Sequence, residues 1–186
     1  MTSSLKFFGI SGSLRKASFN TELLRGLAAL APSDVTFDIY EDLRNVPPYD
    51  DDVRAAGMPE VVTKLIDRVR VADAVVIAIP EYNYSVPGVL KNAIDWISRA
   101  QPSVLADKPL GIVGASAGAF GTARSQYHLR QIAVFLDMHV MNKPEVMVTS
   151  AYEKFDKEGK LTDEPTKKIL GTFVNAFRDW TIRLKK

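Results

Sequence analysis

Apolar positions along this chain form two kinds of pattern that alternate from one end to the other. Short apolar runs and strict apolar–polar alternation are typical of strands, whereas a repeat of three to four residues is typical of helices. Strands are predicted at residues 5–10, 35–40, 73–79 and 108–114, with a last, interrupted strand at 140–141 and 145–148. Helices are predicted at about residues 18–30, 59–71 and 87–98, from the loop after 121 to 137, and over the apolar positions from 170 to 184.

Because strands and helices alternate without an internal repeat, the pattern predicts a doubly wound α/β domain with a parallel sheet. The run at 35–40 alternates, so we expect it at an edge of the sheet. Ligands of such folds bind outside the carboxyl ends of the strands. The loops that begin near Ser11, Pro80 and Ala115 each follow a predicted strand, so we expect them to meet at one edge.

The segment 41–58 interrupts this alternation. It contains two consecutive prolines and an acidic triplet at 50–52, and it is predicted as a long irregular loop on the ligand side of the sheet. Clustered aspartates raise the question of a divalent cation, but no metal-ligand spacing is recognisable. We therefore predict a solvated turn and no metal site.

Composition limits the function classes without choosing one. The chain has 186 residues, enough for a single domain over 1–186, and its net charge of +2 is too small to argue for nucleic acid or a membrane surface. The absence of cysteine removes thiol catalysis, disulfides and cysteine-ligated metals. Without a signal-peptide region or a bilayer-spanning apolar run, we expect a cytoplasmic protein.

The loop between the first strand and the first helix has the chemistry of a phosphate site. A helix start offers unpaired N–H groups and the positive end of a dipole. Gly12 lets the backbone approach a ligand, and an arginine fork fits phosphate oxygens. The loop supplies its polar side chains from Ser11, Ser13, Arg15, Ser18 and Asn20. It matches neither a Walker A loop nor G-x-G-x-x-G, and an ordinary turn with an N-cap serine is the alternative.

Two motifs, taken together, resemble one known family. The first is Gly9-x-Ser11-Gly12-Ser13-Leu14-Arg15-x-x-Ser18-x-Asn20, and the second is Pro80-Glu81-Tyr82-Asn83-Tyr84-Ser85-Val86-Pro87-Gly88 with the helix up to Trp96. In this order, each behind its own apolar strand, they resemble the NADPH-dependent FMN reductase family, particularly its bacterial quinone and chromate reductases. The resemblance covers about residues 5–148. It implies a flavodoxin-like three-layer sandwich with a five-stranded parallel sheet of order 2-1-3-4-5.

The resemblance implies a role for each loop. The first would hold the FMN phosphate through Ser11, Ser13, Leu14, Arg15, Ser18 and Asn20. The second would border the isoalloxazine ring, mostly with the backbone of Pro80, Glu81, Tyr82 and Asn83. The third would border the ring or ribityl chain with Ser116, Ala117 and Gly118. NAD(P)H would pass a hydride to flavin N5, and a quinone, azo compound or metal oxyanion such as chromate would then be reduced in a ping-pong cycle that requires no catalytic side chain.

The family resemblance also implies a homodimer, or a pair of dimers that forms a tetramer. Aromatic residues and arginine are favoured at protein interfaces. The candidate interface residues are Tyr84, Trp96, Arg124 and Tyr127. The alternative for Arg124 and Tyr127 is a solvated helix face. For Tyr82 and Tyr84 the alternative is a core-facing ring, because tyrosine is often half buried.

Two other functions stay open from the sequence. Residues 114–118 match G-x-S-x-G between a strand and a helix, as in the nucleophile elbow of a serine hydrolase. A triad would also need an acid followed by a histidine, and the chain offers only His128 and His139, with Asp137 very close to the second. The other alternative is a flavodoxin-like electron-transfer protein without turnover. Flavodoxins are commonly strongly acidic, whereas this chain is slightly basic.

Overall fold

The computed structural model describes residues 4–185; residues 1–3, where the chain was predicted to lead into its first strand, and residue 186 lie outside the described range. The strands are β1 (Leu5–Ser11), β2 (Val35–Tyr40), β3 (Ala74–Ala78), β4 (Pro109–Ala115), β5 (His139–Val140) and β6 (Val146–Val148). The helices are α1 (Phe19–Ala29), α2 (Asp51–Ala56), α3 (Glu60–Arg70), α4 (Gly88–Ile97), α5 (Ala123–Phe135) and α6 (Glu164–Leu184). Two 3-10 turns, η1 (Leu43–Asn45) and η2 (Ala151–Glu153), complete them.

The strands form one parallel sheet of order β2-β1-β3-β4-β5, in which β6 pairs with the second half of β4. This is the predicted flavodoxin-like order, with β2 at an edge and the last strand interrupted between β5 and β6. Ser11 pairs with Ala78, and Ala78 with Val113. Strands β1, β3 and β4 therefore end at nearly the same level, and the loops that follow them leave the sheet together.

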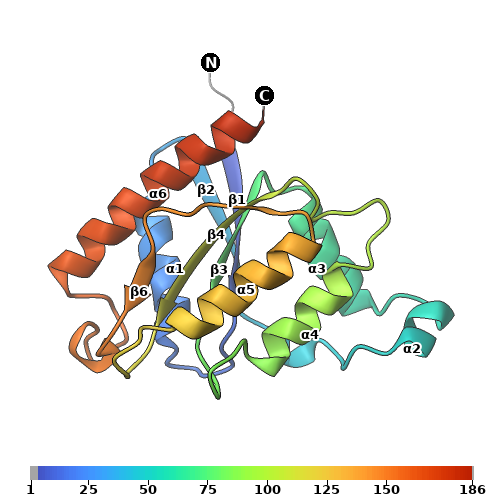
Figure 1. Ribbon diagram of the computed structural model, residues 1–186, viewed down its shortest axis with the longest axis horizontal. Helices are drawn as coiled ribbons and strands as arrows, with labels where there is room; N and C mark the ends of the chain where they lie inside the picture. Colours follow the sequence, from blue (N-terminus) through green and yellow to red (C-terminus); the bar gives the residue numbers. More distant parts are fainter. Residues whose placement is uncertain (1–3, 186) are drawn as a thin grey trace.

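Helices cover both faces of the sheet (Figure 1). Helices α1 and α6 lie on one face, and α3, α4 and α5 lie on the other. Successive residues of β1 serve the two faces: Phe7 packs with Phe177 of α6 at a ring distance of 5.0 Å, whereas Phe8 belongs to the opposite core. A central strand buried on both faces needs apolar residues at every position, which explains the continuous apolar runs.

The prediction of an irregular loop at residues 41–58 is wrong, because this segment contains η1 and α2. Asp50 is the N-cap of α2, and its carboxylate accepts the backbone N–H of Asp52 at 2.8 Å. The acidic triplet thus begins a helix. No residue of α2 is buried, so the helix has no apolar stripe that periodicity could detect.

Candidate functional site

The loop after β1 brings backbone donors to the start of α1. Ser18 is the N-cap of this helix, and its Oγ accepts the backbone N–H of Thr21 at 3.3 Å. The N–H groups of Phe19 and Asn20 belong to the first turn, where an α-helix has no carbonyl to pair with them. Together with the positive end of the helix dipole, these groups favour an anion at this end of α1.

Gly12 allows the loop after β1 to touch the loop after β3. A Cβ atom at this position would lie 2.9 Å from Cδ of Pro80 and 3.0 Å from Cδ2 of Leu90. The Gly12 N–H donates to the Ala78 carbonyl at 2.9 Å and so extends the pairing of β1 with β3. Any side chain here would push the two loops apart, so the close approach requires glycine.

Asn20 joins the first loop to the third. Its Nδ2 donates to the Ala115 carbonyl and its Oδ1 accepts the Ala115 N–H, both at 3.0 Å. The amide predicted as a phosphate donor is therefore committed to the backbone of β4. Ser11 is also committed, because its Oγ lies 2.7 Å from Oγ1 of Thr21 and the residue is fully buried. Because the Ser11 hydroxyl is buried against Thr21 and Ser11 does not line the pocket between the loops, the prediction for that residue is corrected.

The loop after β3 contains a two-residue turn. Tyr82 and Ser85 exchange two backbone hydrogen bonds of 3.1 and 3.0 Å around Asn83 and Tyr84. The φ angles of Asn83 and Tyr84 are 50° and 69°, the left-handed pair that defines a type I′ turn. Tyrosine rarely adopts this conformation, so the backbone of this turn is strained. Tyr82 is 46% exposed and Tyr84 67%, so the alternative that they face the core is wrong.

The loop after β4 is fixed against β6. The Ser116 N–H donates to the Val148 carbonyl at 2.9 Å. Gly121 has a φ of 52°, and a Cβ there would lie 2.6 Å from the backbone of Met147. A residue with a side chain would meet both the strained φ and the close backbone, so this loop also depends on a glycine.

The three loops enclose one pocket at the carboxyl ends of β1, β3 and β4, which confirms the prediction that they meet. It is lined by Ser13, Arg15, Ser18, Phe19, Asn20, Pro80, Glu81, Tyr82, Ala115, Ser116 and Ala117. Of the predicted site residues, those that do not line it are Ser11, Leu14, Asn83 and Gly118. Phe19 and Ala115 line the pocket but were not predicted. Their places, directly after the N-cap and at the last position of a strand, are the signals that could have identified them.

Three serines of the pocket, Ser13, Ser18 and Ser116, share one arrangement. Each Oγ accepts the backbone N–H of a residue two or three positions further along the chain, at distances of 3.1–3.3 Å. A hydroxyl that is held as an acceptor keeps its own proton to donate. The pocket therefore presents oriented O–H donors together with the exposed guanidinium of Arg15. This donor set suits a ligand that carries phosphate and carbonyl oxygens.

Ser116 is not arranged as the nucleophile of a triad. His128 is engaged with Ser85, whose Oγ lies 3.0 Å from Nδ1. His139 is the first residue of β5, and its Nε2 lies 3.2 Å from Oδ1 of Asp107. Strand β5 pairs with the first residues of β4. Ser116 follows the last residue of β4, so the length of that strand separates it from His139. Neither histidine pairs with Ser116, which argues against the hydrolase alternative.

One predicted interface residue lies inside the protein. Trp96 is fully buried in the core, its ring packs against Tyr49 at 4.9 Å, and its Nε1 donates to the Pro47 carbonyl at 2.8 Å. Such a side chain cannot contact another subunit, so the prediction for Trp96 is wrong. Tyr127, another predicted interface residue, is by contrast 52% exposed.

No group of three His, Asp or Glu side chains that could hold a metal ion occurs within residues 4–185. Over the same residues, no helix combines the length and apolar character that crossing a membrane requires.

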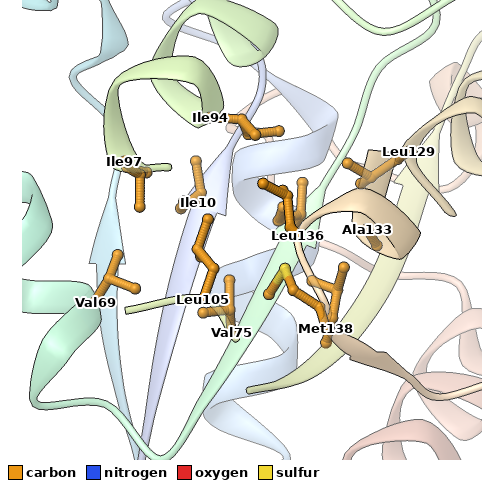
Figure 2. A pocket seen from close by; sticks show the side chains of 12 residues that line it. Ile10, Val69, Val75, Ile94, Ile97, Leu105, Leu129, Ala133, Leu136 and Met138 are labelled. Carbon is orange, nitrogen blue, oxygen red and sulfur yellow. The ribbon is translucent and has the colours of Figure 1, made fainter. Parts of the chain in front are cut away.

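A second cavity lies in the core between the sheet and helices α4 and α5 (Figure 2). It measures about 20 Å³, and its walls are entirely apolar, including Ile10, Ile77, Leu129 and Ala133. A cavity without polar partners holds no ordered water and offers no group that could orient a polar substrate. This core cavity is therefore not a candidate site, and the pocket between the three loops is the candidate that the polar side chains support.

Comparisons with known proteins agree with this fold. A family model described as NADPH-dependent FMN reductase matches residues 5–153. The chain is 46% identical to an NAD(P)H-dependent FMN reductase of Pseudomonas aeruginosa over 185 residues, and 46% identical to a quinone reductase of Escherichia coli over 187 residues; each alignment covers 100% of both chains. Among solved structures, FerB, a flavoenzyme NAD(P)H:(acceptor) oxidoreductase of Paracoccus denitrificans, aligns with a TM-score of 0.87 and 37% identity over 96% of this chain and 98% of its own.

Proposed function

The chain belongs to the NADPH-dependent FMN reductase family, and we propose that it is an FMN-dependent NAD(P)H oxidoreductase that reduces quinones. The observation that carries this proposal is the pocket between the three loops, with its anion-binding start of α1 at one side and backbone-rich walls at the other. Relatives named for FMN reductase and quinone reductase activity over their full length support the same assignment.

The residues of the pocket fit the two ends of FMN. The phosphate would be held by Arg15, Ser13, Ser18 and the first N–H groups of α1, because all of them donate hydrogen bonds. The Arg15 guanidinium and the start of the helix also carry positive charge. Residues 80–82 and 115–117 would border the ring, because they offer backbone groups and the Tyr82 ring, and their one charged side chain, Glu81, is paired with Arg124.

Bound FMN would supply the redox chemistry by accepting a hydride from NAD(P)H and giving electrons to an acceptor. The protein's own contribution would be binding and orientation. The one carboxylate that lines the pocket, Glu81, is engaged by Arg124, so it is not available as a proton donor or acceptor for a substrate. Quinones are the proposed acceptors, with azo compounds and metal oxyanions such as chromate as further candidates for the same exposed site.

We also propose that the protein forms a homodimer or tetramer and acts in the cytoplasm as one domain over residues 1–186. Tyr84, Arg124 and Tyr127 are the proposed interface residues, because both tyrosines are exposed, the partly buried Arg124 lies over the Tyr84 ring, and these residue types are favoured at interfaces. Sedimentation across a dilution series, with flavin retention followed in parallel, tests the assembly. A monomer that keeps its flavin and full turnover at micromolar concentration would remove the interface from the function.

The experiment that tests the function begins with the visible spectrum of the purified protein, followed by titration of the apoprotein with FMN. We expect flavin absorption bands, FMN binding, and oxidation of NADPH or NADH that depends on an added quinone. Protein that binds no FMN would refute the proposal. Protein that binds FMN but does not oxidise NAD(P)H would instead support an electron-transfer protein without turnover.

A further inference from the structure

The carboxylate of Glu81 points away from solvent and into the start of α5. Its side chain is only 7% exposed, although it lies in a surface loop that lines the pocket. Oε2 accepts the backbone N–H of Arg124 at 3.1 Å and that of Ser125 at 3.4 Å. Oε1 accepts from the Arg124 guanidinium. The carboxylate therefore caps α5 from a different loop, 43 residues away in the sequence.

Helix α5 needs this cap because its own N-cap residue does not provide one. Thr122 has a φ of 71° and makes no side-chain capping bond to the helix backbone. Its Oγ1 instead accepts from Nε2 of Gln126 at 3.1 Å. The first N–H groups of a helix must find partners elsewhere when the N-cap side chain is turned away, and a negative charge is favourable at this end.

Two further contacts join the same loops. Oγ of Ser125 donates to the Pro80 carbonyl at 2.9 Å. Cζ of Arg124 lies 3.6 Å from the ring centroid of Tyr84 and 4.4 Å from that of Phe120, so the guanidinium is held between one aromatic ring of each loop. The loop after β3 is thus attached to α5, and through it to the loop after β4.

We infer that Glu81 is a positioning residue: its side chain does not touch the ligand but fixes the backbone of residues 80–82 against α5, and thereby sets the ring-binding side of the pocket. This inference rests on the proposed function for the identity of the ligand. Glu81 belongs to the ring side, and the phosphate side is built by the separate loop before α1. Loss of the Glu81 carboxylate should therefore weaken any ligand that carries the ring, with or without a phosphate.

The test compares FMN with riboflavin, which has the same ring without the phosphate, on apoprotein carrying Glu81→Ala or Glu81→Gln. Glu81→Ala should raise the dissociation constants of both flavins by the same factor, about tenfold. Glu81→Gln should raise both by a smaller common factor of about two to three, because the glutamine oxygen can still accept the two helix N–H groups. Ser125→Ala, which removes the bond to Pro80 and carries less risk to folding, should act in the same direction.

Asp34→Asn is the matched control. Asp34 forms a similar partly buried pair with Arg178 of α6, with oxygen–nitrogen distances of 2.8 and 3.0 Å to Nε, but it lies before β2, at the opposite end of the sheet from the pocket. The Asp34→Asn substitution should lower the thermal midpoint of the protein and leave its affinities for both flavins unchanged. A Glu81→Ala protein that behaves in the same way would show a purely structural role and overturn the inference, as would a loss restricted to FMN.

Amide hydrogen exchange of the apoprotein provides a reading that does not depend on flavin. Glu81→Ala should speed exchange at Arg124 and Ser125 by about tenfold or more, while the Asp34→Asn control leaves these amides protected. Unchanged protection at both amides would overturn the inference. If the wild-type apoprotein bound neither flavin, the proposed function would fail, and the exchange experiment would still decide whether Glu81 fixes the two loops.

Discussion

Arg15→Ala tests whether the start of α1 is the phosphate side of the pocket. Arg15 lines the pocket and is exposed, and its Cζ lies 5.6 Å from the centroid of the Phe19 ring in the first turn of α1. This stacking holds the guanidinium beside the free N–H groups of the helix. The alanine variant should bind FMN more weakly, because one charge-assisted contact to the phosphate is lost.

The expected size follows from the exposure of the side chain. A hydrogen bond to a charged partner contributes about 1.5–3 kcal/mol. Solvent weakens the contact of an exposed arginine, so the lower end of this range applies, about 1.5 kcal/mol or about a tenfold higher dissociation constant. The remaining donors, Ser13, Ser18 and the helix start, should keep FMN binding measurable.

The assay is fluorescence titration of apoprotein with FMN and, separately, with riboflavin. Riboflavin lacks the phosphate, so Arg15→Ala should change its affinity little. Lys16→Ala is the matched control, because Lys16 is the neighbouring cation and does not line the pocket. An equal loss for FMN and riboflavin, or an equal effect of the two substitutions on FMN, would refute the assignment of the phosphate to this loop.

Three further outcomes are expected. Ser116→Ala should weaken FMN by about 1 kcal/mol and retain turnover when FMN is saturating; an esterase activity that disappears with this hydroxyl would reinstate the hydrolase. Leu129→Ala should enlarge the apolar cavity and lower the free energy of unfolding by about 2–5 kcal/mol, and added benzene should raise the thermal midpoint of the variant but not of the wild type. Hydrogen bonds from Arg178 hold the pKa of Asp34 below its usual value, so the pair stabilises the fold above about pH 4 and loses this effect as the pH falls through the lowered pKa; urea midpoints of wild type and Asp34→Asn should differ more at neutral pH than at about pH 3.

The sheet could be predicted from the sequence because its signal is local. Strands buried on both faces need continuous apolar runs, and right-handed crossovers then leave few orders for them. Helix α2 could not be predicted in this way, since it buries nothing and depends on the Asp50 cap. Trp96 was assigned to an interface instead of the core, because its partners Pro47 and Tyr49 lie in a segment without a recognisable pattern.

The position of the candidate pocket could be predicted, whereas the contacts that its side chains make could not. The topology brings three loops to one edge of the sheet, and polar residues in those loops are visible in the sequence. Whether a polar group faces the ligand or the protein depends on partners far along the chain. Asn20 is engaged by Ala115, 95 residues away, and Glu81 by Arg124, 43 residues away. A list of polar loop residues therefore mixes ligand contacts with residues that hold the loops.

The difference between residues that contact the ligand and residues that hold the loops has a physical reason. A loop that must present backbone groups to a flat ligand has few side chains of its own to fix its position, and its conformational entropy opposes binding unless other contacts restrict it. Here the restriction comes from buried polar contacts between loops, such as those of Asn20 and Glu81, and from close backbone approaches at Gly12 and Gly121. Such contacts join protein groups to one another and include no ligand atom, so the ordering cost falls on folding rather than on binding. Ligand affinity in this protein should consequently be as sensitive to these residues as to those that touch the ligand.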